Sequence, residues 1–492
     1  MSGASEYNFA WQLTWRLRES SSLADAATGE TVSASDLRRL IPNFGAQLLA
    51  AGLKAGDRIL IGCALSPGCC IAYLGAMYAG LVPVPVEKGA LDSAGHQMLE
   101  GTGARAVWTE KQTRFAWKRG KDFITLDGRP ADLEVSSLAP APCRENSLAV
   151  LVRTSGSTGT PRFVMVTHGN LTANTEAIVR SQNLSSDDRA MLILPVSYCF
   201  GASVLHSHLY QGGGVVFDRR FMFPDKVLHS MNKYHCTTFA GVPTVYNILL
   251  RRSNIRSIPM PSLRRFLQAG GPLAPQQVIE MRDAVPSASF YVMYGQTEAT
   301  ARISVLDPER LAKKLGSVGR ALDNLTVRIA DEDGKDLALG QVGEVLVKGP
   351  SISAGYFDDP EASRRVFDDG WLRTGDLAHL DEDGYIWIHG RKADFLKTRG
   401  VRVSFAEIEA KVAAVPGVYE CAVAAVAHPE AGEALALYIV PDKEARNVAR
   451  DIRRSLPVHW TCDSINIVSG IPKTFRGKVS RASLGNLKGM AL

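Results

Sequence analysis

The sequence predicts an α/β protein with more than one domain. Its 492 residues are enough for several hydrophobic cores, and 46% hydrophobic and 22% charged residues are ordinary for a globular chain. Through the first three hundred residues, short apolar runs typical of strands alternate with helical segments, as in parallel sheets covered by helices. After Gly319, acidic turn signals separate short strands, which indicates antiparallel hairpins, and a small α/β segment begins near residue 394.

The N-terminal region contains a stretch without charge, residues 59–86, that is long enough to cross a bilayer. Prolines at positions 67, 83 and 85 interrupt this stretch, so we expect no membrane span. The stretch fits a buried βαβ unit better, because strands that are buried on both faces are apolar throughout. We expect a strand over 58–65, a helix over 69–79 and a strand over 81–86.

Later apolar runs continue the strand pattern, at 190–195, 214–217, 236–240 and 289–293. Turn signals rich in acidic residues, at 331–334 and 381–384, then lie on either side of a predicted strand over 343–347. Since the sequence has no low-complexity linker, we expect a short joint near residues 391–394. The predicted domains are therefore residues 1–391 and 392–492.

Charge and cysteine content indicate which partners and which redox environment the protein has. The formal net charge of +6 is mild for this length, so we expect no nucleic-acid partner. The eight cysteines include no Cys-x-x-Cys motif, and their scatter over a long chain is not that of a disulfide scaffold. The N-terminus lacks the basic-then-apolar pattern of a signal peptide. We therefore expect a reducing, cytoplasmic environment.

The stretch 154–162, Thr-Ser-Gly-Ser-Thr-Gly-Thr-Pro-Arg, directly follows the apolar run 148–152. A strand that leads into such a loop suits a phosphate group, because glycines let backbone N–H groups approach and hydroxyls donate to anionic oxygens. The loop lacks the Gly-Lys-Ser/Thr of a P-loop and the Gly-x-Ser-x-Gly of a nucleophile elbow. On this motif alone, a phosphate loop and a flexible surface turn remain equal alternatives.

Four segments downstream favour the phosphate loop. They are Tyr-Gly-Gln-Thr-Glu at 294–298, Trp-Leu-Arg-Thr-Gly-Asp at 371–376, the stretch 390–409 that opens with Gly-Arg, and Pro-Lys-Thr-Phe-Arg-Gly-Lys at 472–478. Their order and spacing resemble those of the adenylate-forming superfamily, which includes acyl-CoA synthetases, fatty acyl-AMP ligases and nonribosomal adenylation domains. The resemblance covers about residues 30–485.

The resemblance implies a large N-terminal domain of two helix-covered, mostly parallel sheets with a small β-barrel-like subdomain, followed by a small, mobile α/β domain. It also implies a reaction. A carboxylic acid and ATP form an acyl-adenylate with release of pyrophosphate, and the acyl group then passes to CoA or to the phosphopantetheine arm of an acyl carrier protein. Mg2+ would neutralise the triphosphate.

The resemblance also assigns a nucleotide site. The loop that holds the β- and γ-phosphates comprises Thr154, Ser155, Gly156, Ser157, Thr158 and Gly159. Glu298, a hard oxygen donor, is the implied Mg2+ ligand together with Thr158, and Thr297 is expected to touch the α-phosphate. The adenine would lie against Tyr294, Gly295, Gly271 and Pro272. Asp376 and Arg391 would bind the ribose.

By the same resemblance, Lys478 is the mobile catalytic lysine that bridges the carboxylate and the α-phosphate. Two positions depart from the family pattern. Arg162 replaces the lysine that usually follows the loop proline, which keeps the charge but changes its shape to a planar fork. Ala393 stands where the family hinge is usually aspartate or lysine, which removes a polar contact from the expected domain switch.

The implied acid pocket is largely apolar, and its expected members are Tyr198, Phe200, Gly201, Val204, Gly241, Val242, Gly270 and Met293. Adenylation domains for α-amino acids place an aspartate in the segment that corresponds to 200–204. Gly201 removes that counter-charge and is expected to open space for a chain or ring. Burial of an unpaired ammonium is costly, so the pattern favours a fatty, hydroxy or aryl acid.

Alternatives remain for the acceptor and for the activity. Basic residues outnumber acidic ones between 446 and 488, which suits docking of a carrier protein or CoA phosphates but is also typical of a solvated face. One rival activity is an amino acid adenylating enzyme of the nonribosomal type. Another is a non-catalytic, nucleotide-binding pseudo-enzyme, which Arg162 and Ala393 favour and which Glu298, Asp376 and Lys478 oppose.

Overall fold

The computed structural model describes residues 6–491 with internal gaps, and the chain divides into two compact units. The residues not described are 1–5, 112–122, 131–137, 155–161, 393–394, 399–400, 429–431, 443–444, 458–459, 461, 474–478, 486, 488–489 and 492. The larger unit comprises Met1–Val327 with Val347–Arg373, and the smaller comprises Arg328–Leu346 with Thr374–Leu492. The expected domain boundary at residue 391 stays a prediction.

The largest sheet has nine strands, and its six central strands are parallel. In spatial order the strands are β15 (Arg320–Ala321), β14 (Ser304–Leu306), β13 (Ser289–Tyr294), β12 (Arg265–Gln268), β11 (Thr238–Gly241), β9 (Arg189–Leu192), β10 (Gly214–Phe217), β1 (Ser22–Asp25) and β2 (Thr31–Ser33). The edge strands β2 and β15, and β14 next to β15, are antiparallel to their neighbours. The four apolar runs predicted as strands between residues 190 and 293 are confirmed as β9, β10, β11 and β13.

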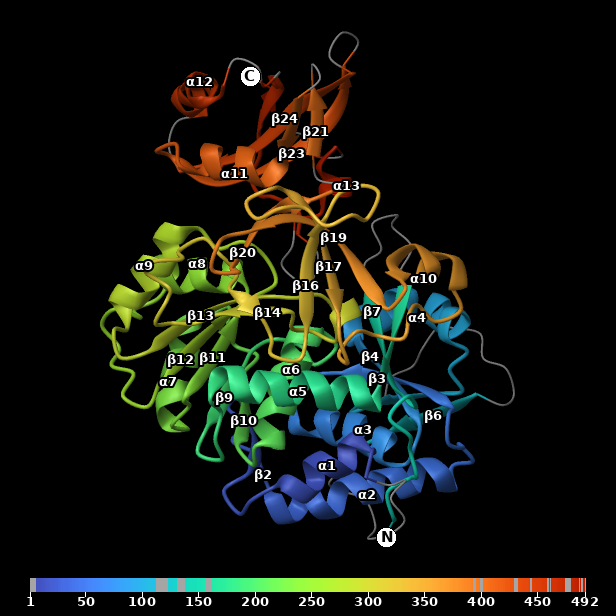
Figure 1. Ribbon diagram of the computed structural model, residues 1–492. Coiled ribbons are helices and arrows are strands. Elements are labelled where there is room, and N and C mark those ends of the chain that lie inside the picture. The colour runs from blue at the N-terminus through green and yellow to red at the C-terminus, as the bar shows by residue number, and fades with distance from the viewer. Residues whose placement is uncertain are drawn as a thin grey trace. The chain divides into compact units, whose positions relative to one another are not determined.

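Helices cover this sheet, as the pattern of parallel strands requires. They are α1 (Phe9–Arg16), α5 (His168–Gln182), α6 (Cys199–Tyr210), α7 (Pro224–Lys233), α8 (Pro243–Arg252) and α9 (Pro275–Ala284). Figure 1 shows α8 and α9 beside strands β11 to β13. Helix α5 begins with a capping box, in which the side chains of Thr167 and Asn170 each accept a hydrogen bond from the other residue's backbone N–H.

A second, four-stranded parallel sheet contains the predicted βαβ unit. Its strands in spatial order are β4 (Val82–Glu87), β3 (Arg58–Cys63), β5 (Ala106–Thr109) and β6 (Ile124–Asp127). The accompanying helices are α2 (Ala34–Ala50), α3 (Pro67–Tyr78) and α4 (Lys88–Thr102). The uncharged stretch 59–86 is thus confirmed as strand, helix and strand, with bounds shifted by one or two residues. Among the described residues, no helix combines the length and the apolar character that a membrane crossing needs.

Two further β structures complete the strands described before residue 392. Strands β7 (Leu148–Thr154) and β8 (Arg162–Thr167) form an antiparallel pair, so a strand does lead into the glycine-rich loop. Strands β16 (Thr326–Ala330), β17 (Gly343–Lys348), β19 (Trp371–Leu380), β18 (Phe367–Asp368) and β20 (Ile386–Arg391) form a five-stranded sheet, with α10 (Pro360–Val366) before β18. The turn predicted at 381–384 joins β19 to β20, with Gly384 at φ +77°.

The C-terminal part is α/β, as predicted. Its six strands are β21 (Phe395–Thr398), β22 (Val401–Ser404), β23 (Val418–His428), β24 (Gly432–Pro441), β25 (Cys462–Ile467) and β26 (Met490–Ala491). Its helices are α11 (Phe405–Ala413), α12 (Ala445–Ser455) and α13 (Arg481–Leu484). Buried side chains from α11, β24 and α12, such as Ile408, Leu437 and Ile452, form its core.

Candidate functional site

The segment after β13 folds back tightly on itself. A short 3-10 helix, η2 (Thr297–Ala299), follows Gln296. Thr300 and Ala301 then adopt φ angles of +61° and +143°, which residues other than glycine rarely adopt. A Cβ atom at Gly295 would overlap the carbonyl oxygen of Ala301, so glycine is required there. Such local strain is typical of functional loops.

Glu298, the expected Mg2+ ligand, is held in place by a neighbouring segment. The hydroxyl of Tyr356 donates a hydrogen bond of 2.9 Å to Glu298 Oε1, and the Ser353 N–H donates to the Glu298 carbonyl at 2.9 Å. Among the described residues, only Tyr356 donates to this partly exposed carboxylate. A carboxylate that is fixed through one oxygen suits Mg2+, which usually keeps waters and substrate phosphates as its other ligands.

Arg162 lies next to the same tyrosine. Its guanidinium is 5.3 Å from the centre of the Tyr356 ring, and its Nε donates to Asp359 Oδ2 at 3.2 Å. The structure therefore brings together Arg162 and Glu298, which are 136 positions apart in the sequence, through Tyr356. Thr154 donates to the Arg162 carbonyl at 3.4 Å. The remaining loop residues Ser155, Gly156, Ser157, Thr158 and Gly159 lie outside the described residues.

Residues expected in the acid pocket also lie together in the larger unit. The Tyr198 and Phe200 rings pack edge to face, with centroids 6.3 Å apart. Gly270 has φ +89°, and a Cβ atom there would lie 2.7 Å from the Tyr198 hydroxyl and 3.1 Å from Val242. Thr297 donates to the Cys199 sulfur at 3.5 Å, which joins this group to the η2 loop. Gly271 and Pro272 are exposed, and Tyr294 at the end of β13 is half-buried.

Three members of the expected pocket lie in close packing, and one expectation about them fails. Gly201 is buried in α6, and a Cβ atom there would overlap the carbonyl oxygen of Pro195 and lie 2.9 Å from that of Leu194. The expectation that Gly201 opens space for the substrate is therefore wrong, because backbone atoms fill that space. A Cβ atom at Gly241 would lie 2.8 Å from Val245. Val204 is buried within α6, with an exposed fraction of 2%.

The sequence pattern did not reveal Arg302. This arginine follows the strained Ala301, and only 2% of its surface is exposed. Its guanidinium lies 5.3 Å from the centre of the Phe200 ring, and Nη1 donates to the sulfur of Met293. Burial lowers the pKa of Arg302 to about 10, so the side chain keeps its charge at neutral pH. Its apolar neighbours Ala301 and Ile303 were the one available sign of burial in the sequence.

The expected ribose-binding pair is assembled within the smaller unit. Asp376 on β19 and Arg391 on β20 are direct partners in the antiparallel register, and Arg391 Nε donates to Asp376 Oδ1 at 3.2 Å. The Thr374 hydroxyl accepts from the Asp376 N–H at 3.1 Å and donates to the Val345 carbonyl at 2.8 Å. Gly375 turns the chain between them at φ +72°. Lys478 and Ala393 lie outside the described residues.

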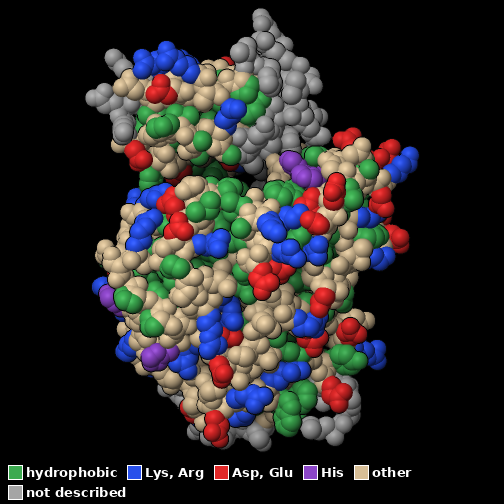
Figure 2. Space-filling view, turned by 60° about the vertical axis from the view of Figure 1, so that its left-hand side comes forward, with side chains coloured by type: hydrophobic (Ala, Val, Ile, Leu, Met, Phe, Trp, Pro, Cys, Tyr) green, Lys and Arg blue, Asp and Glu red, His purple; other side chains and the backbone are tan. Residues whose placement is uncertain are grey.

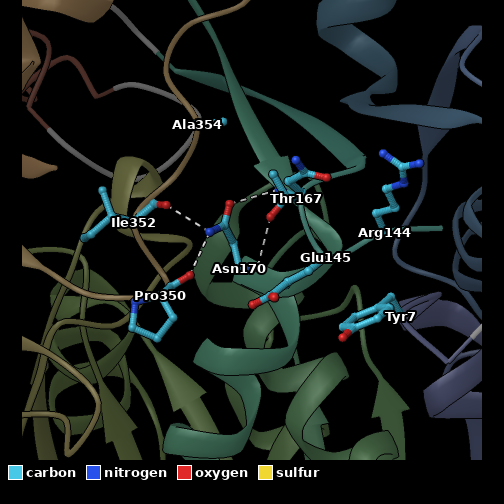
Figure 3. A pocket seen from close by; sticks show the side chains of 10 residues that line it. Tyr7, Arg144, Glu145, Thr167, Asn170, Pro350, Ile352 and Ala354 are labelled. Atoms are coloured by element: carbon cyan, nitrogen blue, oxygen red, sulfur yellow. Dashed lines mark hydrogen bonds between the residues drawn. The ribbon is translucent and has the colours of Figure 1, made fainter. Parts of the chain in front are cut away.

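A cavity of about 510 Å³ lies elsewhere in the larger unit, at the start of α5. Figure 3 shows Asn170 at its wall, where the side-chain amide donates to the carbonyls of Pro350 and Ile352. Its other labelled residues, including Tyr7, Arg144 and Glu145, do not belong to the expected nucleotide or acid site. The cavity therefore gives no support to the predicted chemistry.

The exposed surface has a mixed charge distribution. On the face drawn in Figure 2, basic and acidic side chains are interspersed over the larger unit. The described residues also include surface ion pairs, such as Arg180 with Asp323 and Arg251 with Glu280, each with an N–O distance of 2.6 Å. A nucleic-acid surface usually gathers its basic residues in one patch or stripe.

Comparison with known proteins places these residues in a family. Residues 16–357 match the model of the AMP-binding enzyme family, and residues 407–478 match the model of the AMP-binding enzyme C-terminal domain. The chain belongs to the AMP-binding enzyme family. This family lies within the adenylate-forming superfamily, so the predicted superfamily and α/β fold are confirmed.

Individual relatives of this family member cover almost its whole length. A feruloyl-CoA synthase of Amycolatopsis sp is 29% identical over 93% of this chain and 94% of its own. A sulfoacetate–CoA ligase of Cupriavidus necator is 30% identical over 90% of both chains. Among solved structures, an o-succinylbenzoate CoA synthetase of Bacillus subtilis bound to its acyl-adenylate intermediate has a TM-score of 0.88, with 25% identity over 99% of both chains. This AMP-binding enzyme is an AMP-forming acid–thiol ligase.

Proposed function

We propose that this AMP-binding enzyme joins a small carboxylic acid of fatty, hydroxy or aryl type to CoA, through an acyl-adenylate. The observation that carries the proposal is the fixed Glu298 carboxylate, which Tyr356 holds at the end of a strained loop beside residues of the acid pocket. The Asp376–Arg391 pair adds a second element that suits a nucleotide, because a fixed carboxylate accepts hydrogen bonds from ribose hydroxyls.

Each residue has a role in this proposal. Glu298, with Thr158, would hold Mg2+, which when bound neutralises charge on the triphosphate of ATP. Thr297 would donate to the α-phosphate, and Tyr294 with Gly295 would border the adenine. Arg162 would attract the leaving pyrophosphate at the end of the phosphate loop, although its pairing with Asp359 must be exchanged for that contact. Lys478 would place the acid's carboxylate against the α-phosphate.

We also propose that residues 392–492 act as a mobile lid that carries Lys478 into and out of the active site. A hinge of this type concentrates the backbone rotation in a few residues, here near Ala393. The basic residues of this region suit the phosphates of CoA. An acyl carrier protein would use the same phosphopantetheine chemistry and is the alternative acceptor.

The pocket argues against an α-amino acid. The reason is the buried cation of Arg302 rather than the missing side chain of Gly201, because a guanidinium repels an ammonium group. The names of the relatives point to aryl and short anionic acids, namely ferulate, 4-coumarate and sulfoacetate. A cytoplasmic location fits the eight cysteines, all of which are free thiols.

The test is exchange of labelled pyrophosphate into ATP, followed by CoA-dependent release of AMP. The purified protein is assayed with fatty, hydroxycinnamic, short dianionic and α-amino acids. Acid-dependent exchange is expected with at least one acid that lacks an ammonium group, and Glu298→Gln should suppress it. Exchange with α-amino acids alone would contradict the acid class, and ATP binding without exchange would favour a pseudo-enzyme.

A further inference from the structure

Arg302 is a buried cation that has no counter-ion among the residues that the structure describes. Within the described part of the chain, no Asp or Glu forms an ion pair with it, and the side chain's contacts are the Phe200 ring and the Met293 sulfur. The ionisable groups that influence its pKa are Cys199 and Tyr198 rather than carboxylates. Its backbone is fixed as well, because Asn174 donates to the Arg302 carbonyl at 3.0 Å.

Such a placement is unfavourable for the empty protein. The burial of a charged side chain is energetically costly unless a partner compensates it. A thioether is a weak acceptor, and an aromatic face compensates only part of the desolvation of a cation. Most of the five N–H donors of the guanidinium therefore have no strong acceptor from the described residues.

The neighbours of Arg302 identify what its partner would be. Phe200 and Met293 belong to the expected acid pocket, and Phe200 packs on Tyr198, whose hydroxyl lies next to Gly270. Cys199, at the start of α6, also accepts from Thr297. The guanidinium is thus positioned among groups that would surround the acid, and its fork-shaped donors match a planar or tetrahedral anion.

We propose that Arg302 determines substrate specificity by binding a second anionic group of the acid, a carboxylate or a sulfonate, in addition to the carboxylate that is adenylated. This inference rests on the proposed function and narrows it to acids that carry two negative charges. The second anion supplies the counter-charge that the described protein residues do not. An acid with an uncharged group at that position leaves the guanidinium buried and unpaired, so it is bound far less well.

The experiment compares acids that differ only in the second charge. Pyrophosphate exchange is measured with three matched pairs: sulfoacetate and 3,3-dimethylbutanoate, succinate and 4-methylpentanoate, and 4-carboxycinnamate and 4-isopropylcinnamate. In at least one pair, the dianionic acid is expected to have a kcat/KM about 100-fold higher. The three pairs differ in length, so they also report the distance between the two anionic groups.

Arg302→Met tests the residue itself, because methionine has a similar length and no charge. We expect about a 100-fold loss of kcat/KM for the preferred dianionic acid and less than about a threefold change for its uncharged partner. Arg302→Lys should recover part of the loss. Arg365→Met removes a surface arginine of α10 that is 71% exposed, and this matched control should behave as the wild type.

Stability separates this role from a structural one. If Arg302 is unpaired in the empty protein, Arg302→Met should not lower its melting temperature, because a buried cation is replaced by a thioether. A lower melting temperature with equal losses for both acids of a pair would overturn the proposal. A wild-type enzyme that prefers the uncharged acid in every pair would also overturn the proposed role of Arg302. Its exchange activity would still support the proposed function. Failure of exchange with every acid would overturn the proposed function, and this assignment with it.

Discussion

The contact between Tyr356 and Glu298 allows a sharp test of the proposed Mg2+ site. Tyr356→Phe removes only the hydroxyl that donates to Glu298 Oε1 at 2.9 Å. The ring remains, so the packing of Phe367 at 5.7 Å and the Arg162 guanidinium at 5.3 Å should be kept. A hydrogen bond to a charged group contributes about 1.5–3 kcal/mol, and the lower value applies because Glu298 is partly exposed. We therefore expect about a tenfold loss of kcat, with half-maximal activity at a higher Mg2+ concentration.

The assay is pyrophosphate exchange titrated with Mg2+ at saturating ATP. Glu298→Gln should lower kcat at least about 100-fold, because it removes the charge from the proposed Mg2+ ligand. In the Glu298→Gln background, Tyr356→Phe should cost little more, since the two residues act through one contact. Tyr246→Phe is the matched control, because it removes a buried hydroxyl that donates to the Leu267 carbonyl at 2.7 Å in the core. Additive losses, or an unchanged Mg2+ requirement in both single variants, would refute the reasoning.

Four other outcomes follow from the structure and sequence. Asp376→Ala should mainly raise the KM for ATP, because the proposed ribose contact would form before the transition state, and an unchanged KM in steady-state assays would argue against that role. Lys478→Ala should cut adenylation by several orders of magnitude while thioester formation from a supplied acyl-adenylate suffers far less, and equal losses would contradict a mobile lysine. Gly201→Ala should reduce the free energy of unfolding by about 1–3 kcal/mol in urea melts without broadening acid specificity, because its Cβ meets the Pro195 carbonyl. Burial lowers the pKa of three histidines, to about 4 for His168, 3 for His206 and 4 for His208. Because the unfolded chain therefore binds protons first as the pH falls, the free energy of unfolding should decrease by about 1.4 kcal/mol per buried histidine between pH 7.5 and pH 5.5. Urea melts that show greater stability at pH 5.5 would contradict this effect.

The order of strands and helices was predictable because local signals and burial agree along most of the chain. The uncharged stretch 59–86 has strand-like apolar runs on both sides of a Ser-Pro helix start, and the structure forms β3, α3 and β4 there. The run 214–217 became β10 with the same bounds. In these segments the apolar residues and the turn residues favour the same structure, so tertiary packing had little to override.

The candidate site was predictable only as a list of residues, not as a set of contacts. Glu298 and Tyr356 are 58 positions apart, and their hydrogen bond depends on how residues 351–356 return to the η2 loop. Local sequence patterns carry no information about such a return. The expectation that Gly201 opens space for the substrate was wrong for a related reason. A glycine in a helix has the same sequence signal whether it faces a pocket or a carbonyl, and only the position of Pro195 decides between them.

Arg302 shows how a missed residue changes the functional argument. Arginines are mostly exposed, so the sequence alone gave no reason to single this one out. The backbone at Thr300 and Ala301 is strained and precedes Arg302 directly. The buried Arg302 side chain contacts Phe200 and Met293, two members of the expected acid pocket. The proposed exclusion of amino acids then rests on a cation that is present rather than on a carboxylate that is absent. A buried positive charge repels an ammonium and attracts a second anion, so Arg302 would account for both the proposed exclusion and the proposed requirement for a second anionic group.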